Sequence, residues 1–236
     1  MSPADMSDLA RKNIFDKLKL SGQEISQLGI AWLVFMVAII PQAYLGGYVN
    51  FNANHNIIIT QAALMGFALG CAFILHEMGH KFAAQYFRAQ AEFKLDQRGL
   101  LITMVSIAMG FYLLMPGAVF WNSNLSKYSN IRGRVSAAGP VVNLLLASVS
   151  MGLLVFSESP VGSVGWVLFT FGQISFYLNI FLGIFNLLPF WILDGKKILE
   201  WSEGVWLAFY LLFILLIVAV KVAIPSYTFN FFFFSL

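Results

Sequence analysis

Charged residues are scarce in this chain: they make up 11% of its 236 residues, while hydrophobic residues make up 59%. A soluble domain carries about 25% charged residues, so the composition excludes an ordinary soluble fold and predicts long apolar segments in lipid. The length suits one compact membrane domain and leaves no room for a large soluble module. The formal net charge of +3 arises from basic residues beside apolar segments, which indicates orientation in a membrane rather than nucleic-acid binding.

The chain also has almost no cysteine and no recognisable signal peptide. Cys71 is the only cysteine, which excludes an intrachain disulfide and a cysteine-based metal cluster. Residues 1–27 lack the pattern of a cleavable signal, because the apolar run after them is too long and has no small-residue cleavage site. We expect residues 1–27 to form a cytoplasmic, amphipathic arm on the membrane surface. Residues 28–236 then form a single intramembrane domain.

The apolar segments predict an all-α polytopic membrane protein with five or six transmembrane helices. A span needs about 20 consecutive, mostly apolar residues. Segments of this length occur at 28–49, 57–87, 135–156, 166–188 and 204–224. We therefore expect a multi-pass protein of the cell membrane.

Residues 99–119 form a further apolar segment that has two interpretations. By hydropathy alone they cross the membrane. If they instead enter and leave on one side, each of the 14 basic residues except Lys221 lies on the cytoplasmic side, as the positive-inside rule favours. Gly110 and the pair Pro116-Gly117 offer places to turn. We therefore expect a membrane-re-entrant segment at about 93–119, enclosed by the surrounding helices.

The sequence His-Glu-Met-Gly-His at residues 76–80 is the strongest functional signal. On a helix, His76 and His80 lie one turn apart and project from the same face, so both imidazoles can bind one zinc ion. Glu77 points elsewhere, but it can reach a zinc-bound water and act as a general base. The motif follows about 30 Å of apolar helix, which places this site near the basic, cytoplasmic end of the segment.

A catalytic zinc ion normally has three protein ligands and one open position, so a third ligand must come from elsewhere in the chain. His55 lies at the opposite end of the same apolar segment, which is too far away. The acidic residues after the penultimate apolar segment are Asp194, Glu200 and Glu203. Asp194 fits best because it precedes Gly195 at a helix break, although it can alternatively be the cap of a short helix.

Three motifs together resemble the site-2 protease family: the histidine motif in an apolar helix, Gly-Pro-Val-Val-Asn at residues 139–143 and NLLPFWILDG at residues 186–195. The resemblance implies that Asp194 completes the site of one zinc ion per chain. It also implies that Asn186 contacts the substrate backbone or the oxyanion. In that family the segment after the zinc-binding helix often forms a membrane-re-entrant sheet, and residues 93–119 occupy that place.

The resemblance implies an intramembrane zinc metalloprotease that hydrolyses peptide bonds in or near transmembrane segments. Its partners are then transmembrane protein substrates and the lipid bilayer. One alternative is an HExxH membrane protease of another family, with Glu200 or Glu203 as third ligand. The other is a non-catalytic relative that binds membrane helices, or a metal transporter. The intact Glu77 argues against an inactive relative, and most predicted spans contain no ionisable residues for a transport path.

Overall fold

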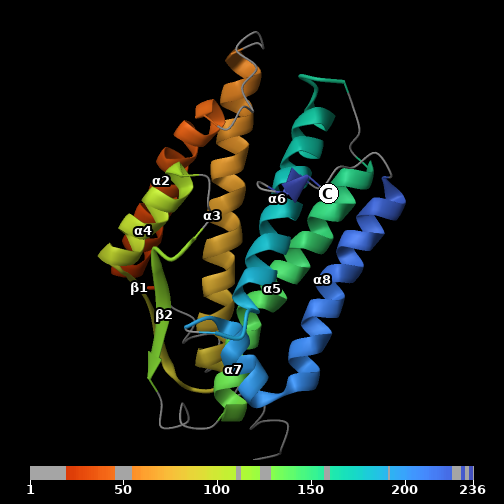
Figure 1. The fold of residues 1–236 in the computed structure, drawn as a ribbon. Helices are drawn as coiled ribbons and strands as arrows, with labels where there is room; N and C mark the ends of the chain where they lie inside the picture. The colour runs from red at the N-terminus through yellow and green to blue at the C-terminus, as the bar shows by residue number, and fades with distance from the viewer. Residues whose placement is uncertain are drawn as a thin grey trace, which may run out of the picture.

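The computed structural model describes residues 20–45, 55–109, 113–122, 129–156, 160–190 and 192–224, together with 230–231 and 234–235. These residues form a bundle of long helices with a small sheet beside one end (Figure 1). The long helices are α2 (Gly22–Leu45), α3 (His55–Tyr86), α5 (Ser129–Phe156), α6 (Val164–Asn186) and α8 (Glu203–Ala223). The short elements are α4 (Gln97–Ala108), α7 (Asp194–Trp201), the paired strands β1 (Gln90–Leu95) and β2 (Gly117–Asn122), and the paired strands β3 (Asn230–Phe231) and β4 (Phe234–Ser235).

Long apolar helices with exposed apolar side chains make this chain a membrane protein. Four of the described helices are long and apolar enough to cross a membrane: Ile59–Tyr86 of α3, Asn130–Val155 of α5, and the whole of α6 and α8. On α8 the side chains of Leu207, Leu211 and Leu215 are each more than half exposed. Such a surface is unfavourable in water and suits contact with lipid.

The expected count of five or six spans is not reached among the described residues, and two helices account for the difference. α2 is not among the four candidate spans, and it begins at Gly22, earlier than predicted, with the polar residues Gln23, Glu24 and Gln27 in its first turns. α4 has 12 residues, which rise about 18 Å and cannot cross a hydrocarbon core of about 30 Å. Residues 1–19, most of the predicted arm, lie outside the described residues.

The segment predicted to re-enter the membrane is a strand, a helix and a second strand. β1 and β2 pair antiparallel with Leu95 opposite Gly117, and the Asp96 N–H donates to the carbonyl oxygen of Pro116 at 2.9 Å. The chain therefore comes back to the end of β1 after passing through α4, which lies beside α2 (Figure 1). The chain is mostly helical as expected, and this sheet is an exception that the family resemblance implied. Hydropathy did not predict it, because hydropathy is a local property whereas strand pairing joins distant residues. Gly110, the other predicted turn residue, lies outside the described residues.

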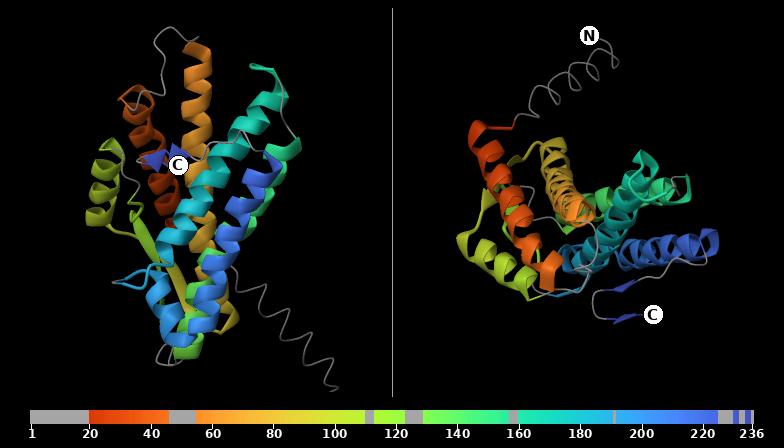
Figure 2. Two further views of the ribbon diagram at one scale, coloured as in Figure 1. Left: turned by 45° about the vertical axis from the view of Figure 1, so that its right-hand side comes forward. Right: turned by 90° about the horizontal axis from the view of Figure 1, so that it is seen from above.

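α3 lies between the two halves of the bundle and contacts both. α2 and the sheet pack on one side of it, while α5 and α6 pack on the other (Figure 2). Two buried clusters hold these layers together, one containing Phe35, Phe73 and Phe93 and the other containing Phe176 and Phe213. α3 and α5 approach closely at Gly79, where a Cβ atom would lie 2.8 Å from the carbonyl oxygen of Ala138. Small residues permit such close contacts between membrane helices, and this crossing brings the histidine motif against α5.

Candidate metal centre and active site

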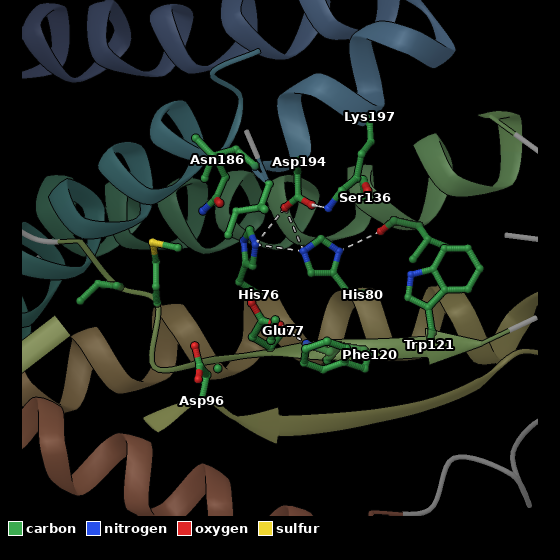
Figure 3. Close-up of a pocket in the computed structure, with 18 residues that line it drawn as sticks. His76, Glu77, His80, Asp96, Phe120, Trp121, Ser136, Asn186, Asp194 and Lys197 are labelled. Carbon is green, nitrogen blue, oxygen red and sulfur yellow. Dashed lines mark hydrogen bonds and ion pairs between the residues drawn. The ribbon is translucent and has the colours of Figure 1, made fainter. Parts of the chain in front are cut away.

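The two motif histidines lie in the half of α3 that is next to the sheet (Figure 3). Their rings are nearly perpendicular, at 87°, and their Nε2 atoms are 3.0 Å apart. Both residues are buried, with 4% of His76 and 8% of His80 exposed. Because an α-helix places residues four apart on one face, both nitrogens point into the same space between α3, α5 and α7.

Asp194 reaches the two histidines from the first turn of α7. Its Oδ2 atom lies 3.4 Å from His76 Nε2 and 3.0 Å from His80 Nε2. The residue that caps α7 is Leu193, and Asp194 is the first helical residue. The alternative role of Asp194 as a helix cap is therefore wrong. Burial raises the pKa of the Asp194 carboxyl group, but His80 and hydrogen bonds from both imidazoles outweigh it and lower the pKa below its usual range. An ionised carboxylate is the form that binds a metal.

The three side chains fit a zinc ion. Their ligand atoms are separated by 3.0, 3.0 and 3.4 Å, close to the distance of about 3.3 Å between neighbouring ligands of a tetrahedral zinc ion with bonds of 2.0–2.1 Å. Gly139 of α5 leaves space for a metal ion, since a Cβ atom there would lie 2.5 Å from the Nε2 atoms of both His76 and His80. Two imidazoles and one carboxylate are a donor set of catalytic zinc sites, which keep the fourth position open for water or substrate.

The second nitrogen of each imidazole is held by α5. His76 Nδ1 lies 2.5 Å from Asn143 Oδ1, and His80 Nδ1 lies 2.8 Å from the carbonyl oxygen of Val135. Val135, Gly139 and Asn143 are spaced four residues apart, so they share one face of α5. Because both partners are oxygen acceptors, each Nδ1 carries a hydrogen. A bound metal ion would then take the lone pair of each Nε2 in place of the hydrogen bond to Asp194.

Asn143 is oriented in turn by a buried polar chain that continues into α6. Its amide nitrogen donates to Asn179 Oδ1 at 2.9 Å, and the Asn179 amide donates to the carbonyl oxygen of Ser175 at 2.8 Å. Asn143 and Asn179 are 0% and 1% exposed, so each must satisfy its polar atoms within the protein. The chain of donors and acceptors therefore fixes Asn143 with its oxygen, and not its nitrogen, toward His76.

Substitution of Asn143 should weaken zinc binding. Asn143→Leu removes the acceptor for His76 Nδ1, and loss of such an outer partner typically lowers metal affinity about 10- to 100-fold. Competition with a chelator of known affinity measures the change. Ser148→Ala is the matched control, because Ser148 is an exposed residue of the same helix that donates only to its own helix, at the Leu144 carbonyl oxygen. Equal zinc affinity in both variants would show that α5 does not orient His76.

Glu77 lies on the sheet side of α3, beside a cavity of about 270 Å³. Its Oε2 atom accepts a hydrogen bond from the Val119 N–H at 2.8 Å. The cavity is bordered by His76, His80, Glu77 and Asp194, by residues of β2 and by Asn186 (Figure 3). The Asn186 amide nitrogen donates to the Leu182 carbonyl oxygen at 3.0 Å, and an amide nitrogen carries a second hydrogen.

The other residues considered as third ligand lie apart from the histidines. Glu200 is exposed and forms an ion pair with Arg132. Glu203 is exposed in the first turn of α8. His55 is the first residue of α3, about 30 Å of helix away from His76. Among the carboxylates of the described residues, only Asp194 joins the two histidines in a group with metal-binding geometry.

A metal-binding cluster of this kind, with a glutamate beside it and apolar helices around it, defines a membrane metalloprotease. The sequence profile of peptidase family M50 matches residues 62–165 and 161–206 of the chain, which together are more than half of its length. The chain belongs to this family, the site-2 protease family, and is a zinc metalloprotease.

Several relatives have names of the same class. A candidate zinc metalloprotease of Methanocaldococcus jannaschii is 30% identical over 172 residues, covering 72% of this chain and 83% of that protein. The candidate zinc metalloprotease YwhC of Bacillus subtilis is 33% identical over 146 residues, covering 55% of this chain and 64% of that protein. The candidate zinc metalloprotease Rip2 of Mycobacterium tuberculosis is 30% identical over 137 residues, covering 53% of this chain and 52% of that protein. No solved structure matches the chain.

Gly139 and Asn143 belong to a motif that the sequence shows but that was given no role in the site, and three further contributors were not predicted. The Val135 carbonyl and the Val119 N–H are backbone groups, which every residue has, so no residue type reveals them. Asn179 does leave a signal, because it precedes Asn186 by seven residues and so shares a face of α6 with it. That spacing alone also fits an asparagine that simply joins two membrane helices.

Proposed function

We propose that this chain is an intramembrane protease that hydrolyses peptide bonds in or near the transmembrane segments of other membrane proteins. In this proposal His76, His80 and Asp194 hold one zinc ion per chain, and Glu77 is the general base. The observation that carries it is the convergence of three buried ligand atoms beside a glutamate within a bundle of apolar helices.

Glu77, Asn186 and Asn143 have separate roles in the proposed reaction. Zinc, when bound, supplies a Lewis acid that lowers the pKa of water and polarises the scissile carbonyl. Glu77 accepts a proton from the attacking water and returns it to the leaving amine. Asn186 donates its second amide hydrogen to the substrate carbonyl oxygen and stabilises the negative charge that develops there. Asn143 keeps His76 oriented throughout.

β2 offers the substrate a place to bind in extended form. The carbonyl groups of a transmembrane helix are paired within the helix, so the substrate must unwind locally before water can attack one of them. The N–H of Val119 points away from β1 and toward Glu77. An extended substrate segment that adds to this edge of β2 would lie along the cavity, where main-chain hydrogen bonds give affinity and side-chain pockets give specificity.

The active site faces the cytoplasm in this proposal, and the chain passes the membrane several times. Basic residues flank the elements that surround the site: Lys94 on β1, Arg98 at the start of α4, and Arg132 and Arg134 at the start of α5. A positively charged end of a membrane domain normally lies on the cytoplasmic side. The substrate bond is then cut near that face of the bilayer.

The proposal is tested with the purified chain in liposomes and a panel of single-span substrates. We expect at least one substrate to be cut within or beside its span. Cleavage should stop when a chelator removes zinc and return when zinc, but not magnesium, is added back. Cleavage that persists without zinc contradicts the metal assignment. Cleavage of unfolded soluble peptides, with no membrane segment cut, contradicts the intramembrane assignment.

A further inference from the structure

The two outer edges of the small sheet are bound by carboxylates at the same cross-strand position. Phe93 of β1 and Val119 of β2 are opposite each other in the register. The Val119 N–H donates outward to Glu77 Oε2 at 2.8 Å, and the Phe93 N–H donates outward, on the other side, to Glu24 Oε1 at 2.9 Å. The cross-strand pair of Phe93 and Val119 is thus held between a carboxylate of α3 and a carboxylate of α2.

Both of these carboxylates are tied to the zinc-site helix. Glu77 belongs to α3, and Glu24 Oε1 also accepts from the Nζ of Lys81, the residue directly after His80. Glu77 and Lys81 are four residues apart, so they project from one face of α3. Glu24 is 2% exposed and Lys81 is 1% exposed. Removal of one partner from such a buried ion pair leaves an uncompensated charge and is strongly unfavourable.

The start of α2 also covers the next outward N–H of β1. Gln27 Oε1 accepts from the Leu95 N–H at 2.8 Å, two residues beyond Phe93 on the same edge. Glu24 and Ser21 close the first turn of α2 with reciprocal hydrogen bonds of 2.9 and 3.1 Å, a capping box. The outer edge of β1 is therefore bound at the N–H groups of Phe93 and Leu95 by an ordered helix start. The edge of β2 at Val119 is the one that faces the cavity.

We propose that Glu24, Lys81 and Gln27 are positioning residues that fix the sheet across α3 and thereby set which substrate bond lies beside Glu77. The inference rests on the proposed function, since the position of β2 matters to cleavage only if a substrate strand pairs with it. A shift of one residue in the pairing between the substrate and β2 turns every substrate side chain to the opposite face. It also places a different peptide bond beside Glu77. If the β1 edge is released, the sheet moves relative to α3 and cleavage spreads to neighbouring bonds.

The test compares Lys81→Met, Glu24→Gln and the double variant, each as the full chain in liposomes. Mass spectrometry of the products gives the ratio of cleavage at the main bond to cleavage at adjacent bonds. In Lys81→Met a buried carboxylate loses its cation, and we expect this ratio to fall about tenfold, with a raised KM and unchanged zinc content. In the double variant a neutral glutamine still accepts the Phe93 N–H, so most of the ratio should return. Glu92→Gln is the matched control, since Glu92 lies on the same strand in an exposed pair with Lys94.

Amide hydrogen exchange of residues 90–95 tests the same contacts without a substrate. Exchange should be about tenfold faster in Lys81→Met and in Gln27→Leu and unchanged in Glu92→Gln. Gln27→Leu carries no charge change, so it decides the matter if a charge variant fails to fold. Zinc-loaded variants with the wild-type cleavage ratio and exchange rate overturn the proposal. A fall in rate and zinc content at an unchanged ratio overturns it too, because that is the result of a purely structural role. If the wild type cuts no membrane substrate, the proposed function fails, while exchange still decides whether these residues hold the sheet.

Discussion

Replacement of Glu77 by glutamine should reduce cleavage by about 10²- to 10⁴-fold, the usual contribution of a general base, while the zinc content stays the same. The amide has nearly the shape of the carboxylate, and its oxygen can still accept the Val119 N–H that now bonds Glu77 Oε2 at 2.8 Å. Glu77 is not one of the three converging ligand residues, so the metal should remain. The rate is measured on a single-span substrate in liposomes, and zinc is measured by elemental analysis of the same samples.

Glu92→Gln makes the same chemical change at an exposed position of β1 and should cleave at the wild-type rate. Two results would contradict the role given to Glu77. A Glu77→Gln variant that cleaves within about tenfold of the wild type places the proton transfer on another group. A variant that loses its zinc makes Glu77 a ligand instead of a base.

Replacement of Asp194 by alanine should abolish stoichiometric zinc binding, whereas Glu200→Ala should leave it intact. Asp194 Oδ2 lies 3.4 and 3.0 Å from the Nε2 atoms of His76 and His80. Loss of a direct ligand exceeds the loss of an outer partner, which is 10- to 100-fold, so we expect zinc affinity to fall by more than about 100-fold. Glu200 is exposed and pairs with Arg132, and such a pair contributes about 0–1 kcal/mol to the free energy of unfolding.

Titration of both alanine variants with a competing chelator separates the two assignments of the third ligand. The reverse result, with zinc lost from Glu200→Ala and kept by Asp194→Ala, would mean that α7 turns a different face toward the histidines in the zinc-loaded protein. A fluorescence-detected melting curve of each variant without zinc shows whether a loss of metal follows from a loss of folding.

The long helices were predictable because apolar length is a local property of the chain. The predicted segment 57–87 corresponds to α3 at 55–86, and the segment 166–188 corresponds to α6 at 164–186. The sheet was expected only through the family resemblance, since its strands are separated by an apolar helix that looks like part of a span. The buried pair of Glu24 and Lys81 left no signal, because it joins residues 57 apart in the sequence.

The metal cluster was predictable to the extent that helical spacing determines it. His76 and His80 share a face wherever their segment is helical, so their convergence needed no tertiary information. The arrival of Asp194 at that face depends on how α7 follows α6, and no local pattern sets this path; the residue was found by its motif. The orientation of each imidazole depends on α5, whose register against α3 is set by close contact at Gly79 and Gly139.

Helix α6 carries two amides that serve different parts of the site. Asn179 supports Asn143 behind His76, and Asn186, two turns later, borders the cavity. Directly after α6, a short turn leads into α7 and Asp194. Because both amides stand on one continuous helix, a displacement of α6 would move them together. A substitution that shifts α6 should therefore disturb the support of His76 and the cavity wall at Asn186 together, even where it touches neither.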